Sequence, residues 1–194
     1  MEELYRYDLA SFFITMEQLG IPVNIKRYME IGVQDGNSTV EVVRKYPGLE
    51  LMVLCDNWGD AHGGTGRGSH EYVEARLRDA ALSNMDLNQR LVQAPGVLFL
   101  DGDSRIRVPT YFANNPEMYF DLIYVDDDHS AATLTRHLGV VLGKADFIAC
   151  HDLCMEGLAA AVYFEYLKRG QEYILIYDFQ TQSRMGIFVK RERL

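Results

Sequence analysis

The sequence predicts an α/β protein in which a mostly parallel sheet is covered by helices on both faces. Short apolar segments alternate along the chain with segments of helical periodicity, and this alternation is typical of βαβ units. The stretch YMEIGVQDGNST, residues 28–39, runs from a strand-like segment through a glycine-punctuated turn into a helical pattern. The last two apolar segments follow each other without a helix between them, so we expect them to pair antiparallel.

The predicted elements follow one another in a regular order. The chain starts with an amphipathic helix over about residues 3–19, within the segment 1–20, because apolar side chains recur there at helical spacing; these are Leu9, Phe12, Phe13 and Met16. Strands are expected at about residues 26–32, 51–56, 97–101, 121–126, 145–150, 172–178 and 184–190. Helices are expected at about residues 37–46, 70–92 with a break near Ser83, 104–114, 130–142 and 155–169. Neither a repeat nor a linker interrupts this order, so we interpret residues 1–194 as a single domain.

Composition places the chain among soluble globular proteins. Of its 194 residues, 48% are hydrophobic and 24% are charged, and the formal net charge is −9. This charge disfavours a nucleic-acid partner, because proteins that bind the phosphate backbone carry a basic face. No apolar run reaches the roughly 18 residues that span a membrane, and the N-terminus lacks the apolar region of a signal peptide. The three cysteines have no framework spacing, which indicates a reducing compartment. We therefore expect a cytoplasmic protein without a membrane partner.

A glycine-rich segment, residues 57–70, breaks the alternation after the second strand. It contains GDAHGGTGRG at residues 59–68 and lacks the Gly-Lys-Ser/Thr ending of a phosphate-binding P-loop. Two interpretations stay open for it. It is a surface loop, or it is a lid beside the carboxyl end of the strand, where α/β folds bind ligands.

The turn after the first strand carries the first functional signal. The residues EIGVQDGNS, 30–38, place two glycines four apart and do not spell the Gly-x-Gly-x-x-Gly of a dinucleotide site. Gly32 allows a tight turn off the strand, and Gly36 allows close backbone approach at the start of the helix. Glu30, at the strand end, would repel a pyrophosphate but can pair with an ammonium group. The stretch thus favours a cofactor with a cationic end over NAD, with a structural role for Glu30 as the alternative.

Polar residues also follow the next two strands. Asp56 ends the second strand, where an acid holds the ribose hydroxyls in nucleotide-binding α/β folds. Trp58 comes two residues later and could stack near the nucleoside or only cover the sheet edge. Asp103 and Ser104 follow the third strand and could bind an adenine edge or only cap the next helix.

Three motifs in this order resemble those of class I S-adenosylmethionine-dependent methyltransferases. EIGVQDGNS looks like motif I of the O-methyltransferases in that class. DLIYVDDDHS, residues 121–130, is similar to the D-L-I-x-x-D-G-D-H-S segment of a subgroup that includes sugar O-methyltransferases. FIACHDL, residues 147–153, is similar to the segment that follows in that subgroup. The resemblance covers about residues 26–190 and implies a Rossmann-like, doubly wound sheet of seven strands, one of them antiparallel.

The resemblance also implies S-adenosylmethionine as the cofactor and assigns positions to the residues around it. Gly32 and Gly36 would approach the methionyl part, with Glu30 near its amino group. Asp56 would hold the ribose, and the segment 103–104 the adenine end. The cofactor-binding residues expected in this way are Glu30, Gly32, Gly36, Ser38, Asp56, Trp58, Asp103, Ser104 and Asp126.

An acid-rich cluster follows the fourth and fifth strands. It comprises Asp126, Asp127, Asp128, His129, His151 and Asp152. Carboxylates gathered in one crevice repel each other unless a proton or a cation intervenes, and oxygen-rich clusters suit hard cations such as Mg²⁺. By resemblance to metal-dependent O-methyltransferases, the ligands would be Asp126 and Asp152, with His151 as a third. The imidazole keeps Mn²⁺ or Fe²⁺ open, and the alternative is that the acids cap the following helix without a metal.

Zinc is a weaker alternative at the same place. Cys150, His151 and Cys154 lie close in sequence, but this spacing matches no standard paired-cysteine site and lacks a second half. We interpret Cys150 and Cys55 as small buried apolar residues.

The expected chemistry follows from the cofactor. Its methyl group is already activated, so the enzyme has to align an acceptor oxygen with it and remove a proton. A divalent metal would lower the pKa of the acceptor hydroxyl. Asp128 or His129 is the expected general base, although each could instead only start the following helix. Two departures from the motifs leave the substrate side less defined: Asp127 stands where Gly is usual, and Gly143-Lys144-Ala145 stands where Gly-Gly is usual before the fifth strand.

These observations predict methyl transfer from S-adenosylmethionine to a hydroxyl of a small molecule, assisted by a divalent metal. A metal-independent methyltransferase of the same fold that acts on nitrogen or on protein is an alternative. So are a nucleotide-binding dehydrogenase and a non-catalytic cofactor-binding protein. The expected partner is a hydroxylated small molecule, and a homo-oligomer is left open.

Overall fold

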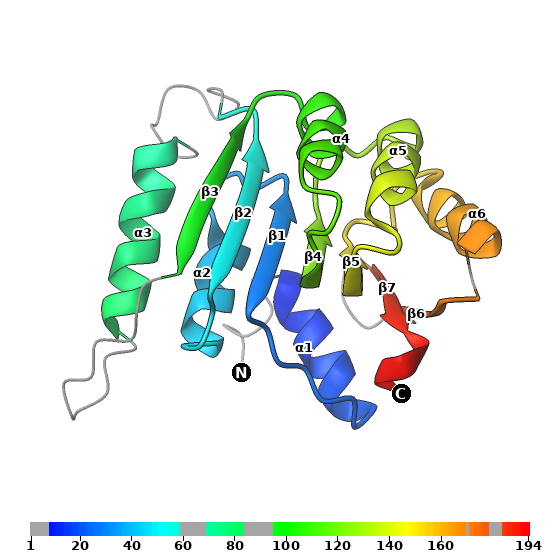
Figure 1. Ribbon diagram of the computed structural model, residues 1–194. Coiled ribbons are helices and arrows are strands. Elements are labelled where there is room, and N and C mark those ends of the chain that lie inside the picture. Colours follow the sequence, from blue (N-terminus) through cyan, green and yellow to red (C-terminus); the bar gives the residue numbers. More distant parts are fainter. Residues whose placement is uncertain (1–7, 59–68, 84–94, 170, 179–183) are drawn as a thin grey trace.

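One sheet of seven strands forms the centre of the molecule (Figure 1). The structure is a computed structural model of the chain and describes residues 8–58, 69–83, 95–169, 171–178 and 184–194. The strands are β1 (Arg27–Ile31), β2 (Leu51–Asp56), β3 (Gly96–Asp101), β4 (Phe120–Val125), β5 (Ala145–Cys150), β6 (Tyr173–Asp178) and β7 (Met185–Lys190). They lie in the order β3-β2-β1-β4-β5-β7-β6. Only β7 runs antiparallel, against both β5 and β6. The predicted sheet with one antiparallel strand is therefore confirmed.

Helices cover both faces of this sheet. They are α1 (Asp8–Gln18), α2 (Asn37–Lys45), α3 (His70–Ser83), α4 (Ser104–Asn114), α5 (Ala131–Val141) and α6 (Leu158–Arg169), followed by a short 3-10 helix, η1 (Arg191–Arg193). Side chains of α1, α2 and α3 share one hydrophobic core with Tyr28 of β1, whereas those of α4, α5 and α6 share the other with Met29. Successive strand residues point to opposite faces, so the near-continuous apolar strands of the sequence correspond to a sheet buried on both sides.

The strand order places the site. From β1 the sheet continues to β2 and β3 on one side and to β4 and β5 on the other. In doubly wound folds, ligands bind in the crevice outside the carboxyl ends of the strands where the order reverses. Here that point lies between β1 and β4, so the loops after these two strands meet there.

Most element boundaries agree with the sequence to within a few residues, and two features differ. The helix expected from residue 155 begins at Leu158, because Gly157 has a left-handed φ of +83° that belongs to a turn. The helix η1 was not predicted. Cys55 and Cys150 are buried, as interpreted, and the apolar face of α1 is buried in the core. Parts of the expected N-terminal helix (1–7), of the glycine-rich loop (59–68) and of the long helix (84–92) lie outside the described residues.

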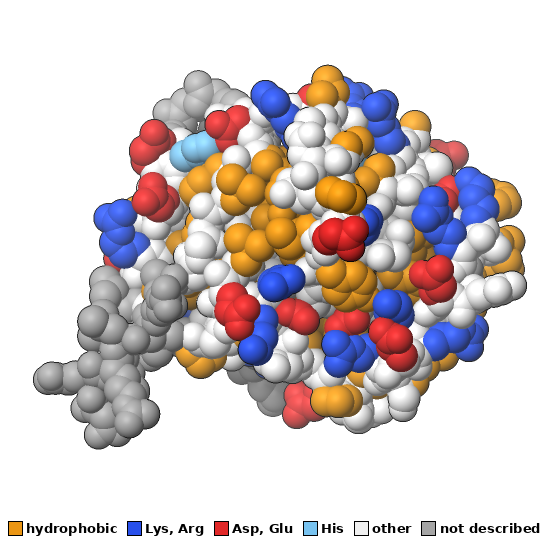
Figure 2. Space-filling view, viewed as in Figure 1, with side chains coloured by type: hydrophobic (Ala, Val, Ile, Leu, Met, Phe, Trp, Pro, Cys, Tyr) orange, Lys and Arg blue, Asp and Glu red, His pale blue; other side chains and the backbone are white. Residues whose placement is uncertain are grey.

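Apolar side chains also reach the surface. Figure 2 shows hydrophobic side chains between charged side chains of both signs on one face. The most exposed apolar side chains of α6 are Tyr163, Phe164 and Leu167.

None of the described helices combines the length and the apolarity that crossing a membrane requires. The homo-oligomer and the lack of a nucleic-acid partner stay predictions.

Candidate active site

The loop after β1 lies directly against the end of β4. Gly32 adopts a φ of +86°, and its N–H donates to the carbonyl oxygen of Cys55 at 2.9 Å. The N–H of Asp126 donates to the carbonyl oxygen of Ile31 at 2.8 Å. A Cβ atom at Gly32 would lie 2.0 Å from the carbonyl oxygen of Asp126. The tight turn is therefore possible only for glycine, and it brings the first motif and the acid cluster together.

Gly36 begins α2 and also requires its glycine. It is the N-cap of the helix, with a φ of +73° and a ψ of +27°, and its lack of a side chain leaves α2 without a side-chain cap. A Cβ atom here would lie 3.1 Å from Cγ1 of Val73 on α3. Ser38 is half-buried in the first turn of α2. Backbone N–H groups at an uncapped helix start attract an anionic group such as a carboxylate.

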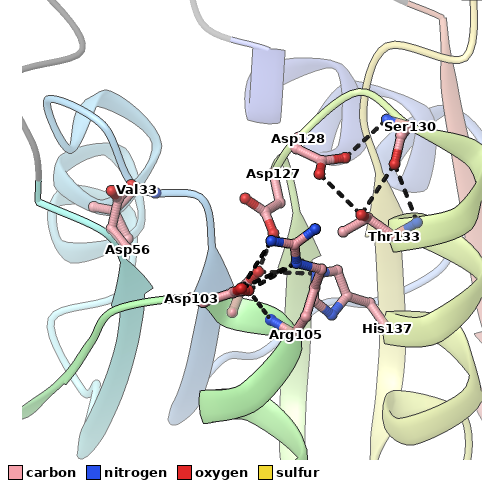
Figure 3. Close-up of polar contacts among 10 residues, drawn as sticks. Val33, Asp56, Asp103, Arg105, Asp127, Asp128, Ser130, Thr133 and His137 are labelled. Atoms are coloured by element: carbon pink, nitrogen blue, oxygen red, sulfur yellow. Dashed lines mark hydrogen bonds and ion pairs between the residues drawn. The ribbon is translucent and has the colours of Figure 1, made fainter.

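Asp56, at the end of β2, holds the β1–α2 loop. Its Oδ2 accepts from the N–H groups of Val33 at 2.7 Å and Gln34 at 2.8 Å, and its Oδ1 accepts from the N–H of Trp58 at 3.0 Å. Figure 3 shows Asp56 beside Val33, apart from the acids that follow β4. A carboxylate has about four acceptor positions, so Asp56 can organise the loop and still accept from a ligand hydroxyl. Its role at the ribose stays a prediction.

Trp58 lies against an aromatic cluster at the β3 edge of the sheet. Its ring contacts His70 edge-on at 4.5 Å and Phe99 at 5.4 Å between ring centroids. Its indole N–H is buried and finds no acceptor within the described part of the chain. Buried polar groups are nearly always hydrogen-bonded, so this N–H is available as a donor to a polar ligand group.

Glu30 is buried below the loop. Its side chain is 1% exposed, and Oε2 accepts from the hydroxyl of Tyr28 at 2.9 Å and from that of Thr39. Burial raises the pKa of Glu30 to about 8, against the lowering effect of these two hydrogen bonds. The contacts fit the structural alternative for Glu30, while its place near an amino group of the cofactor stays a prediction.

The raised pKa of Glu30 predicts a pH-dependent stability. The folded state holds the proton from about pH 4.5 to 8 while the unfolded state releases it, so the free energy of unfolding should fall as pH rises, by at most about 1.4 kcal/mol per pH unit. Glu30→Gln keeps an acceptor for Tyr28 and Thr39 and should flatten this fall, as measured by urea unfolding from pH 5 to 9. Burial also raises the pKa of Glu41 to about 7, so Glu41→Gln is the control for the remaining slope. Parallel curves for wild type and Glu30→Gln would contradict the prediction.

Asp103 and Ser104 lie at the start of α4, and both side chains form hydrogen bonds within the protein. Asp103 is the N-cap, and its Oδ1 accepts from the N–H of Arg105 at 2.9 Å, while the Arg105 guanidinium also pairs with it (Figure 3). These hydrogen bonds lower the pKa of Asp103 to about 2. Ser104 is 6% exposed, and its hydroxyl donates to Asp127 Oδ2. Helix capping is thus observed for Asp103, and contact of either residue with adenine stays a prediction.

Asp127, which replaces the glycine of the motif, forms a closed set of contacts with two helices. Its Oδ2 is 2.9 Å from Nε2 of His137 on α5 and also accepts from Ser104 on α4. Although burial raises the pKa of Asp127, the hydrogen bonds from His137 and Ser104 lower it overall. Ser104 Oγ is 3.2 Å from the same Nε2. In a Ser-His-Asp triad the acid and the serine contact opposite ring nitrogens, so this set links elements and is not a hydrolase triad.

Asp128 and His129 differ in what they contact. Asp128 accepts from the N–H of Ser130 at 3.0 Å and from the hydroxyl of Thr133 at 2.9 Å (Figure 3). Burial raises the pKa of Asp128, but these hydrogen bonds outweigh it and lower the pKa. His129 is 38% exposed, and its Nδ1 is 3.3 Å from Asp152 Oδ2. Asp128 therefore acts as a helix-start acid, and the role of either residue as a base stays a prediction.

The predicted metal ligands Asp126 and Asp152 are brought together from β4 and β5. Ligand atoms of Asp126, His129 and Asp152 lie within 4.8 Å of one another. His151 Nδ1 is 3.0 Å from Asp126 Oδ1 and 3.4 Å from Asp152 Oδ1. Two carboxylates and an imidazole fit a divalent cation such as Mg²⁺, Mn²⁺ or Fe²⁺. His129 thus lies with Asp126 and Asp152 in this donor set, and His151 contacts both carboxylates. Its role as a metal ligand stays a prediction.

A small pocket borders this cluster. It is lined by Val125, Asp126, Asp127, Asp128, His129, Leu134, His137, His151 and Leu158. Acids and imidazoles thus face a partly apolar wall in a confined space.

Sequence reasoning missed two residues of this region. One is His137, on the apolar face of α5. The other is Arg76 on α3, and its side chain donates to the carbonyl oxygen of Asp35 and to Asn37 Oδ1. The only sequence signal for His137 was weak: a histidine at a core position of a predicted helix. The sequence held no signal for Arg76.

Several solved structures have a fold similar to that of this chain. No family model matches the chain, and no curated protein matches it in sequence. Among solved structures it is similar to the apo structure of CalS11, a TDP-rhamnose 3′-O-methyltransferase of calicheamicin biosynthesis, with 18% identity over 93% of this chain and 77% of that chain and a TM-score of 0.60.

Two further solved structures carry bound molecules. An O-methyltransferase from Bacillus cereus in complex with SAH has 16% identity over 93% of this chain and 80% of its own, with a TM-score of 0.57. TomG from Streptomyces achromogenes, an O-methyltransferase involved in tomaymycin synthesis, in complex with SAM, has 15% identity over 93% and 78%, with a TM-score of 0.57. At these identities the likeness shows the fold: this chain has the Rossmann-like α/β fold of these methyltransferases.

Proposed function

We propose that this protein transfers the methyl group of S-adenosylmethionine to a hydroxyl of a small molecule, with help from a divalent cation. The observation that carries the proposal is the meeting of the β1–α2 loop with the Asp126–His129–Asp152 donor set at the point where the strand order reverses. A methyl donor and a metal-held acceptor would therefore be neighbours. The solved O-methyltransferases with SAH or SAM bound have the same fold and support this choice of cofactor.

The chain's own residues fit the cofactor at several places. The uncapped start of α2 suits its carboxylate, Asp56 suits a ribose hydroxyl, and the buried N–H of Trp58 lacks an acceptor among the described residues. S-adenosylmethionine, when bound, supplies a methyl group that its sulfonium already activates. The protein then has to bind the donor, orient the acceptor and exclude water.

On the acceptor side, we propose that Asp126 and Asp152 hold the cation and that His151 orients Asp126. A bound cation would lower the pKa of an acceptor hydroxyl. His129 borders the same pocket, where it either completes the ligand set or accepts the proton; these two roles predict different results for its variants. We propose Mg²⁺ as the cation, with Mn²⁺ or Fe²⁺ as the alternatives that an imidazole ligand permits.

Titration calorimetry with S-adenosylmethionine, its demethylated product S-adenosylhomocysteine and NAD tests the cofactor. We expect both sulfur compounds to bind and NAD not to bind. At a ligand concentration of about 100 times Kd, the stability should rise by about 2.7 kcal/mol. Binding of NAD alone would indicate a dehydrogenase and overturn the proposal.

Turnover separates the remaining alternatives. A panel of hydroxylated small molecules, with and without a chelator, is assayed for S-adenosylhomocysteine release. Activity that a chelator abolishes supports the metal-assisted reaction, and activity on amines or proteins that resists chelators favours the metal-independent alternative. Binding without turnover of any acceptor class favours a cofactor-binding protein.

We further propose a cytoplasmic location, which fits the three free cysteines.

A further inference from the structure

The β1–α2 loop, residues 32–36, and the first residue of α2, Asn37, are held from two sides. On the inner side, Asp56 accepts from the N–H groups of Val33 and Gln34. On the outer side, α3 contacts the second half of the loop. Loops that bind ligands need such support, because a site loosened by about 1 Å loses much of its function.

Arg76 makes the polar contacts of α3 with this loop. Its Nη1 donates to the carbonyl oxygen of Asp35, and its Nη2 donates to Asn37 Oδ1 at 2.8 Å. The planar guanidinium directs both donors at fixed angles, so the two contacts together hold the Asp35 carbonyl and the Asn37 side chain on either side of Gly36. Lysine has the charge but not this paired geometry.

Two neighbours on α3 complete the support. Val73, almost one turn earlier, fills the space beside Gly36. The ring of Tyr72 lies under the guanidinium, 5.7 Å from its carbon to the ring centroid, and helical spacing places residues 72 and 76 on one face. The position of the guanidinium is therefore set by α3 itself.

We propose that Arg76 is a positioning residue for the amino-acid end of the methyl donor. It holds Asp35, Gly36 and Asn37 so that the uncapped start of α2 faces the carboxylate of that end. The inference rests on the proposed function, since it assumes that the methyl donor occupies this loop. Arg76 acts through the loop and not by contact with the reacting atoms.

The test compares two ligands that differ only at the amino-acid end. S-adenosylhomocysteine carries the amino-acid group, and 5′-methylthioadenosine lacks it. For Arg76→Gln and Arg76→Lys we expect calorimetry to give a Kd for S-adenosylhomocysteine about tenfold above wild type, which corresponds to about one charged hydrogen bond. The Kd for 5′-methylthioadenosine should stay within about twofold of wild type. Circular dichroism confirms that each variant is folded at the temperature used.

Arg78→Gln is the matched control. Arg78 lies on the same helix, is 69% exposed and pairs only with Glu74 among the described residues, so both Kd values should stay at the wild-type level. Equal weakening of both ligands by the Arg76 variants would mean a general structural role and overturn the inference. So would full S-adenosylhomocysteine affinity in Arg76→Lys, because charge alone would then suffice. Failure of the wild type to bind S-adenosylhomocysteine would instead refute the proposed function.

Discussion

Gly32→Ala is expected to lower the free energy of unfolding by about 3 kcal/mol or more. The φ of +86° is a conformation that alanine adopts only under strain. The new Cβ would also lie 2.0 Å from the oxygen and 2.5 Å from the carbon of the Asp126 carbonyl. Both are backbone atoms, so no side-chain rotation relieves the contact, and the ends of β1 and β4 must separate. Urea unfolding measures the loss.

Gly139→Ala is the matched control for this prediction. Gly139 lies inside α5, and a Cβ atom there would meet nothing within 4 Å. Alanine is a better helix former than glycine, so this variant should gain about 0.5–1 kcal/mol. If Gly32→Ala were as stable as wild type, the close packing of the β1–α2 loop on Asp126 would be wrong.

Asp126→Asn and Asp152→Asn are expected to abolish metal-dependent activity. Each removes one of the two carboxylates of the proposed donor set. Changes to residues that only orient a ligand already cost about 10–100-fold in metal affinity or activity, so losing a ligand should cost at least about 100-fold. Calorimetry with Mn²⁺ measures the metal affinity, and S-adenosylhomocysteine affinity should change little because the loop contacts remain.

Asp128→Asn provides the control for charge. It removes one acid from the same segment, but its oxygens face Ser130 and Thr133, so Mn²⁺ affinity should persist. If Asp126→Asn and Asp152→Asn kept full metal-stimulated activity, the ligand assignment would be refuted.

His129→Gln then distinguishes the two roles of that residue. As a ligand, His129 would be required for tight Mn²⁺ binding, and its loss should weaken that binding. As the base, its loss should leave Mn²⁺ affinity intact, lower kcat and remove the imidazole limb of the pH profile. His151→Gln gives the reference for an imidazole that contacts Asp126 outside the donor set.

The sequence predicted the layers of the fold because burial leaves a periodic record in it. The apolar runs at residues 51–56 and 145–150 gave strands buried on both faces, and the repeat of Leu9, Phe12, Phe13 and Met16 gave the buried side of α1. Capping by Asp103 was also readable, since the contacting residues lie two apart. The start of α6 was misjudged because an apolar pattern does not reveal the backbone angle of Gly157.

The sequence predicted only part of the candidate site. Parallel strands end at one edge, so Asp126 and Asp152 could be expected to meet. That His129 also lies beside them could not be expected, because this contact depends on how the loops after β4 and β5 pack. Both His129 and His151 contact Asp152.

The sequence by itself determined the order in which strands and helices follow one another along the chain. It also determined the strand–glycine–helix unit at residues 28–39 and the acids at the strand ends, because each of these features is recorded in nearby residues. Only the tertiary structure decided that Asp127 joins His137 and Ser104, and that Arg76 holds the loop around Gly36. The partners in these contacts lie 10 to 41 residues apart. Their meeting depends on how whole helices pack on the sheet, and no local pattern carries that information.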